Sequence, residues 1–313
     1  MHEAIKLAEG SPGLREDLDL MPWLAVGPLF LRETGAGRTL LADALRTARD
    51  RTAVGALPYL LSLIARDQSA TDRWAVAEAT YLEAIDLARE SGQQAGLAFG
   101  LAGLAWLQAR RGRDRECRDH AAELLRLCRD LGTRLYEIWA TAALGDLELG
   151  LGDAARAAVH FERQQRVLAE LAITDADLSP AAELTEAYTR LGRDDEAREV
   201  SATFTAAAQA KGQPWPLARA LRGQGVLAAD AASPHSLTRR YASTRRPWTR
   251  SKPPGPGWPT ASALRRARNR VLAREQLRAA LDIFERLGAG PWAERRTRRD
   301  RRNPQAARPG HDR

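Results

Sequence analysis

A leucine or isoleucine followed by a small residue recurs at intervals of about 40 residues along most of this chain. Twelve residues after each pair, a second small side chain follows. A fixed period in the range of 20–50 residues indicates a stacked repeat architecture. The pairs are Leu24-Ala25, Ile64-Ala65, Leu104-Ala105, Leu144-Gly145 and Leu184-Thr185, and the later small residues are Gly37, Ala77, Cys117, Ala157 and Ala197.

Each unit reads as two antiparallel helices. In the third unit, leucines at helical spacing predict one helix over 95–110 and a second over 115–130. Between them, Gly112 supplies a positive φ and Asp114 is expected to cap the second helix, which Gly132 ends. The turns over 151–153 and 191–194 repeat this arrangement.

The small residues at the two repeat positions are expected to let the paired helices approach closely. Larger side chains there are expected to cost about 1–3 kcal/mol each. Small residues at the eighth and twentieth positions and a bulky one at the twenty-fourth resemble the tetratricopeptide motif, with the best fit at Gly145, Ala157 and Phe161. We therefore predict an all-α, tetratricopeptide-like helical-hairpin solenoid whose repeat of about 40 residues exceeds the usual length of about 34.

The repeat pattern divides the chain into four segments. Helical repeats are expected over 1–232, and terminal repeat helices over 263–294. Between them, 233–262 contains six prolines and no acidic residue, which excludes two continuous helices. An arginine-rich tail follows over 295–313. The tract and the tail are interpreted either as genuine disordered basic segments or, as we prefer, as products of a changed reading frame.

The net charge of +8 comes from these two segments. Each carries a net charge of +6, so the rest of the chain carries −4. The high pI of 10.1 is therefore no evidence that the repeats bind nucleic acid. Binding of nucleic acid through 233–262 and 295–313 stays open as a separate hypothesis.

The sequence shows no motif of a membrane protein, a secreted protein or an enzyme. No run of 18 apolar residues predicts a membrane span, and no signal peptide is recognisable, so a cytoplasmic protein is expected. Cys117 and Cys128 are interpreted as packing residues. No catalytic, cofactor-binding or metal-binding motif is present, and the chain is expected not to be an enzyme.

Some polar residues are interpreted structurally. His120 and His160 share one repeat position, but no third metal ligand accompanies them. Asp194-Asp195 and the pair Asp175 and Asp177 are interpreted as helix starts. The segment Gly35–Thr39 resembles a phosphate-binding loop only weakly, because Arg38 stands where the lysine would be, and it is interpreted as a turn entering a helix.

The candidate binding residues are aromatic. Tyr59, Phe99 and Trp139 recur at one position of the first helix of each unit, which predicts a row of rings along a concave face. Trp106 lies further along its helix, and Arg110 is expected to rim the row. Such a surface could receive a protein partner or a small-molecule inducer. Alternatively, the rings only fill the seams between neighbouring repeats.

Five stretches resemble one family more closely than the generic repeat. They are 97–105, 112–121, 142–152, 213–215 and 264–295. Together they resemble the helical-repeat region of the large ATP-binding LuxR-type (MalT-like) transcriptional regulators of actinobacteria. The resemblance implies an ATPase and a helix-turn-helix domain, neither of which is recognisable here, so specific DNA binding is not expected.

The resemblance thus implies a non-catalytic interaction or signal-sensing region, and this chain is expected to be a truncated or frame-disrupted piece of such a regulator. The alternative is a stand-alone tetratricopeptide-type adaptor between proteins. Finding an ATPase upstream and a helix-turn-helix downstream at the locus would favour the regulator.

Overall fold

The computed structural model describes residues 34–70 and 73–231, together with Ser11 and isolated positions between 271 and 282. All regular secondary structure in this part of the chain is helical. The predictions for Leu24-Ala25, for the tract 233–262, for the tail 295–313 and for most of 263–294 lie outside the described residues. The elements are α4 (Thr34–Asp50), η1 (Val54–Ala56), α5 (Leu57–Ala70), α6 (Trp74–Glu90), α7 (Gln94–Arg111), α8 (Asp114–Asp130), α9 (Leu135–Leu151), α10 (Ala154–Glu170), α11 (Ala181–Leu191), α12 (Asp194–Lys211) and α13 (Pro214–Ala231).

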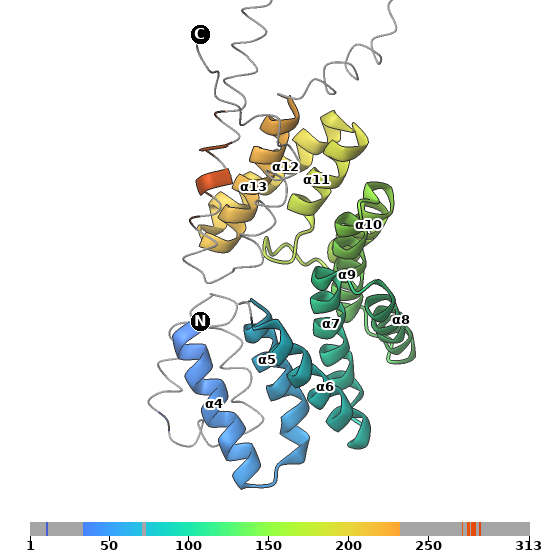
Figure 1. The fold of residues 1–313 in the computed structure, drawn as a ribbon, viewed down its shortest axis with the longest axis vertical. Coiled ribbons are helices and arrows are strands. Elements are labelled where there is room, and N and C mark those ends of the chain that lie inside the picture. The colour runs from blue at the N-terminus through green and yellow to red at the C-terminus, as the bar shows by residue number, and fades with distance from the viewer. Residues whose placement is uncertain are drawn as a thin grey trace, which may run out of the picture.

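The helices form consecutive antiparallel pairs that stack into a curved array (Figure 1). The complete pairs are α5 with α6, α7 with α8, α9 with α10 and α11 with α12, and each helix packs against its neighbours in the chain. The predicted helices over 95–110 and 115–130 are confirmed as α7 and α8. The prediction of an all-α, tetratricopeptide-like repeat fold is therefore confirmed.

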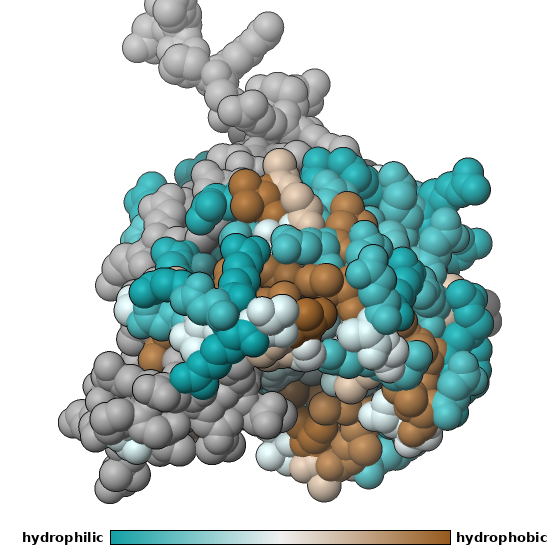
Figure 2. Space-filling view, turned by 90° about the horizontal axis from the view of Figure 1, so that it is seen from below, coloured by the Kyte–Doolittle hydropathy of each residue, from teal (hydrophilic) through white to brown (hydrophobic). Residues whose placement is uncertain are grey.

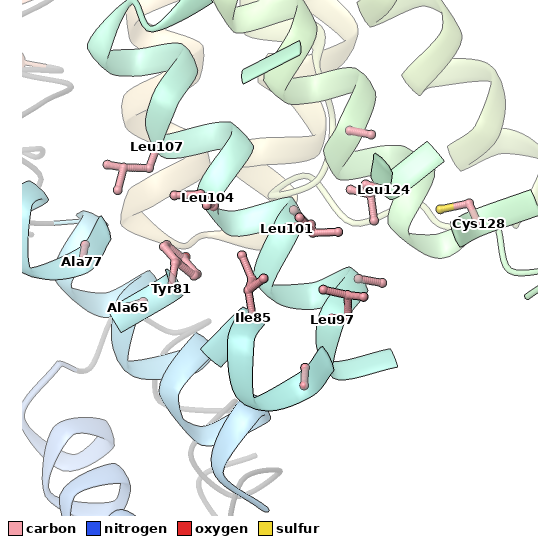
Figure 3. Packing of buried hydrophobic residues seen from close by; sticks show 14 residues of the cluster. Ala65, Ala77, Tyr81, Ile85, Leu97, Leu101, Leu104, Leu107, Leu124 and Cys128 are labelled. Carbon is pink, nitrogen blue, oxygen red and sulfur yellow. The ribbon is translucent and has the colours of Figure 1, made fainter. Parts of the chain in front are cut away.

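First and second helices of a unit are buried differently. The first helix α7 buries residues on most of its circumference, because it contacts α5, α6, α8 and α9. The second helix α8 buries only one stripe, made of Cys117, Ala121, Leu124 and Cys128. In Figure 1, α8 and α10 lie on the outer side of the array. Figure 3 shows the largest cluster, in which leucines of α7 meet Tyr81 and Ile85 from α6 and Leu124 from α8.

Glycines end many of the helices because the chain turns there in the left-handed region. Gly112, between α7 and α8, has a φ of 70°. The prediction that Asp114 caps α8 is wrong: Arg113 is the N-cap residue and provides no side-chain cap, while Asp114 accepts a hydrogen bond from Arg118 Nε at 2.6 Å. Asp153 does cap α10, accepting the backbone N–H of Arg156 at 3.0 Å.

The turn after each second helix falls at one repeat position. Glycine occupies it as Gly92, Gly132 and Gly212, with φ between 63° and 70°. At the same position Thr52 and Ala172 adopt φ of 55° and 54°, although side chains disfavour this conformation.

The segment Gly35–Thr39 is not the turn that was expected. It lies within helix α4, which begins at Thr34. Trp74 and Trp215 lie in the first turns of α6 and α13. Among the helices that the structure describes, none combines the length and apolarity needed to cross a membrane.

The small repeat positions lie where two helices cross. Ala65, Ala105, Cys117 and Ala157 are fully buried. At Gly145, an added Cβ would lie 2.5 Å from Cε1 of Phe161, which is itself buried in α10. Aromatic rings of the second helices therefore occupy space that the first helices leave open.

We expect Gly145→Ala to lower the free energy of unfolding by about 1–3 kcal/mol, because the methyl group would overlap the buried Phe161 ring. Gly150→Ala in the same helix is the matched control. Nothing lies within 4 Å of its added Cβ, so its better helix propensity should raise stability by up to about 1 kcal/mol. Urea unfolding curves of the three proteins measure both effects; a Gly145→Ala variant as stable as Gly150→Ala would contradict this packing.

We expect Cys117 to resist alkylation by iodoacetamide at pH 8 in the folded protein. Its side chain is fully buried, and burial raises the pKa of its thiol to about 12, so the reactive thiolate is scarce. The pKa of Cys128 is also raised by burial. Mass spectrometry should find both thiols modified rapidly only after unfolding in urea; fast labelling of Cys117 in the native state would exclude this interpretation.

Candidate functional site

One stripe of helix α7 is only partly covered by its neighbours. Phe99, Trp106 and Arg110 lie on it at spacings of seven and four residues, which places them on one helix face. Phe99 and Trp106 are partly exposed, whereas most residues between them are buried. Phe99 and Trp106 are therefore the side chains of this stripe that another molecule can reach.

The predicted row of rings is present. Tyr59 of α5 and Phe99 of α7 have ring centroids 5.1 Å apart, and Phe99 and Trp139 of α9 have centroids 5.8 Å apart. Both pairs are tilted or edge-to-face, the arrangement that the quadrupoles of aromatic rings favour. These three side chains form a continuous aromatic row across three repeats because each occupies the same position of a first helix.

The row also fills seams between repeats, as the alternative interpretation expects. Tyr59 and Phe99 pack against the cluster formed by α4 and α5, and Trp139 packs against the cluster around α7. Each ring nevertheless remains partly exposed. The two interpretations are therefore compatible, because one edge of a ring can join repeats while the other contacts a ligand.

Tyr136 extends the aromatic row and was missed by the sequence analysis. Its ring centroid lies 5.5 Å from that of Trp139, one helical turn away on α9. No repeat signal could reveal it, because the corresponding positions of the neighbouring units are Gly96 and Ala176. Burial raises the pKa of Tyr136. Burial and the neighbouring Tyr136 raise the pKa of Tyr59, and the positive charge of Arg66 partly opposes that shift. Both phenols are therefore neutral hydrogen-bonding groups at pH 7.

Trp106 and Arg110 form a second cluster, with Asp146 of α9. The guanidinium carbon of Arg110 lies 4.0 Å from the centroid of the Trp106 ring, a cation–π arrangement. Arg110 Nη2 also pairs with Asp146 Oδ2 at 3.0 Å, and the two side chains are only 3% and 5% exposed. Arg110 is thus not the exposed rim that was expected, because it is buried in a contact between α7 and α9.

Asp146 could have been found from the sequence, since it stands one period after Trp106. That repeat position carries Arg66, Trp106, Asp146 and Glu186 in successive first helices.

A cavity of about 300 Å³ lies beside the cluster of Trp106, Arg110 and Asp146, between the C-terminal turns of α7 and α9. Its lining includes Trp74, Arg110, Arg111, Leu147 and Leu151.

The polar residues outside these clusters form structural contacts. Asp194 and Asp195 lie in the first turn of α12, as predicted. Asp175 and Asp177 do not start a helix: they precede α11 and bind Lys211 Nζ at 2.5 and 2.8 Å. His120 and His160 lie on the neighbouring helices α8 and α10, and among the described residues no group of three potential metal ligands gathers.

Exposure alone does not single out the aromatic row. Viewed from the end formed by α4 to α6, Figure 2 shows apolar side chains between hydrophilic ones. Isolated large apolar residues such as Val76 and Leu82 are 44% exposed. Scattered apolar exposure is usual for soluble proteins. What distinguishes the row is its aromatic character and its continuity across three repeats.

Comparison with known proteins identifies the fold alone. No known protein family matches the sequence, and no curated protein matches it either. Among solved structures, the chain is similar to a signal transduction ATPase with numerous domains (STAND) protein with a tetratricopeptide repeat sensor, from Pyrococcus horikoshii. The TM-score is 0.52 at 14% sequence identity, over 91% of this chain and 41% of that protein. The chain thus has a tetratricopeptide-like helical repeat fold and spans less than half the length of this structural relative.

Proposed function

We propose that this chain is a non-catalytic sensing or interaction region, which binds a protein partner or a small-molecule inducer on the aromatic row of Tyr59, Phe99, Tyr136 and Trp139. The observation that carries the proposal is that the rings touch one another across three repeats and yet remain partly exposed. Aromatic side chains contribute large contact areas at a low cost in conformational entropy, and they are enriched where binding energy is concentrated.

The likeness to a sensor of the STAND class supports this proposal, since that protein carries its repeats as a sensor. The stretches that resemble LuxR-type regulators suggest the same arrangement, in which the repeats receive a signal and other domains of the protein respond to it. In such a regulator, occupation of the repeats would shift their relative positions, and attached domains would respond to that shift. The stand-alone adaptor remains the alternative, and sequencing the locus separates the two.

We expect Phe99→Leu and Trp139→Leu to weaken binding of a peptide selected against the wild-type chain by phage display by about tenfold or more. Leucine keeps an apolar side chain in the seam but removes the ring. Val159→Ala is the control, because Val159 is 61% exposed on the second helix α10. Fluorescence titrations of the four proteins, each with its melting temperature recorded, measure the effect.

A selected peptide that binds the two leucine variants and the wild-type chain with equal affinity would rule out the aromatic row as its site. A metabolite library screened by thermal shift tests the small-molecule possibility with the same variants. A metabolite that raises the melting temperature of the wild-type chain should lose that effect in Trp139→Leu and keep it in Val159→Ala.

A further inference from the structure

The connection between α10 and α11 differs from the others in the array. Residues 171–180 form it, whereas the shorter stretches 51–56, 91–93, 131–134 and 212–213 suffice between the other described second and first helices. The following helix α11 has 11 residues, while α7, α9 and α13 have 17 or 18. The period of about 40 residues would start this helix near residue 175. The segment 171–180 therefore replaces the first turn and a half of a first helix.

Stacking of the first helices is interrupted at this connection. Helix α5 packs beside α7, α7 beside α9 and α11 beside α13, but α9 and α11 do not pack in this way. Among the described helices, only α10 and α11 form an extensive contact between the body α4–α10 and the arm α11–α13. Figure 1 shows the arm at one end of the array, with the connection crossing between the two parts.

A compact group of side chains joins the arm to the body near the turns of the helix pairs. Leu149 of α9 and Phe161 of α10 pack in one cluster with Leu184 and Tyr188 of α11. Two hydrogen bonds secure it: Arg190 Nη1 donates to Leu149 O at 2.8 Å, and Tyr188 Oη donates to Glu162 Oε1 at 2.9 Å. This cluster is the main packing contact between the helices of the body and those of the arm, so a rotation of the arm would take place about it.

The segment 171–180 is tied to the arm by two cations. Arg219 of α13 donates to the carbonyl oxygens of Ala176, Asp177 and Ser179 at 3.3, 3.2 and 2.5 Å, and to Glu183 at 2.5 Å. Lys211 binds the carboxylates of Asp175 and Asp177. Arg219 is 5% exposed, so its bonds to the segment are shielded from water and stronger than surface contacts.

The same segment also contacts the body. Ile173 and Leu178 pack against a cluster of Ile138, Val167 and Leu168, and Gln164 Nε2 donates to Leu178 O at 3.0 Å. The segment therefore lies between two parts of the array and holds both.

Asp177 has electrostatic and hydrogen-bonding features that set it apart within the segment. Burial lowers the pKa of Arg66 on α5, and the charges of Tyr81, Tyr59 and Asp177 oppose that shift. Asp177 thus lies within electrostatic reach of an arginine of α5, although 111 positions separate them in the chain. Its Oδ1 atom is buried without a hydrogen-bond partner, while Oδ2 binds Lys211.

We propose that residues 171–180 act as a strap, which holds the α11–α13 arm against α9 and α10, and that its release lets the arm pivot on the cluster of Leu149, Phe161, Leu184 and Tyr188. The proposal rests on the proposed sensing function and deepens it, because the strap packs on α9, the helix that carries Tyr136 and Trp139 of the aromatic row. The motion itself requires no partner, so it can be tested on the free chain.

The experiment measures a distance between the two ends of the array. Spin labels are attached to Ala42→Cys on α4 and Ala206→Cys on α12, both exposed positions, after Cys117→Ala and Cys128→Ala remove the native thiols. In this background, Arg219→Gln removes the guanidinium that binds the strap, while Glu183 keeps Arg222 as a partner at 2.6 Å. The matched control is Arg198→Gln, which removes an ion pair with Asp195 within α12 that does not touch the strap.

Double electron–electron resonance should give one distance population in the background protein and in the control. Arg219→Gln should add a second population at longer distance. Hydrogen exchange of residues 173–179 should become about tenfold faster, with α11, α12 and α13 as protected as before. Lys211→Gln removes fewer contacts with the strap and should also add a population at longer distance. This variant replaces Arg219→Gln if that protein does not fold.

Two results would overturn the proposal. One is an unchanged distance distribution in a folded strap variant. The other is faster hydrogen exchange throughout α11–α13 as well as in the strap, which would mean that Arg219 stabilises the arm as a whole. Neither result bears on whether the aromatic row binds a partner, and a failed binding test would leave the distance measurement valid.

Discussion

Close approach of paired helices, made possible by side chains of about the size of alanine, is the constraint on which this structure depends. Ala65, Ala77, Cys117 and Ala157 are fully buried at such crossings. Each helix buries its apolar surface against helices one or two places away in the chain, so no central core compensates for a poor contact. Stability is therefore distributed along the array, and one enlarged side chain affects the two or three helices that meet it.

The 40-residue period allowed most of this fold to be predicted from the sequence. It located α7 and α8 to within one residue because leucines, small residues and turn glycines all agree there. The same period predicted the contact of Tyr59, Phe99 and Trp139, since equal positions on parallel neighbouring helices lie side by side. It failed at Asp175 and Asp177, where the pattern of the first helix stops and contacts with Lys211 and Arg219 decide the conformation.

In the candidate site too, the contact between Trp106 and Arg110 within one helix could be predicted from the sequence, whereas the contact of Arg110 with another helix could not. Trp106 and Arg110 are adjacent on one helix face, which the sequence reveals. The burial of Arg110 could not be foreseen, because it depends on Asp146 from another helix and on how closely α7 and α9 pack. Charged side chains at inner positions of this fold therefore cannot be assigned to the surface from their chemistry alone. Arg219, which is 5% exposed, is a second example.

Ala172 links the repeat pattern to the proposed pivoting of the arm. It lies near the start of the strap with a φ of 54°, at a position where three other units have glycine. A left-handed alanine costs about 1 kcal/mol relative to glycine, so the strap carries local backbone strain that its release would relieve. Evolution could then adjust the balance between open and closed arms by exchanging a single methyl group, at an exposed position remote from the aromatic row.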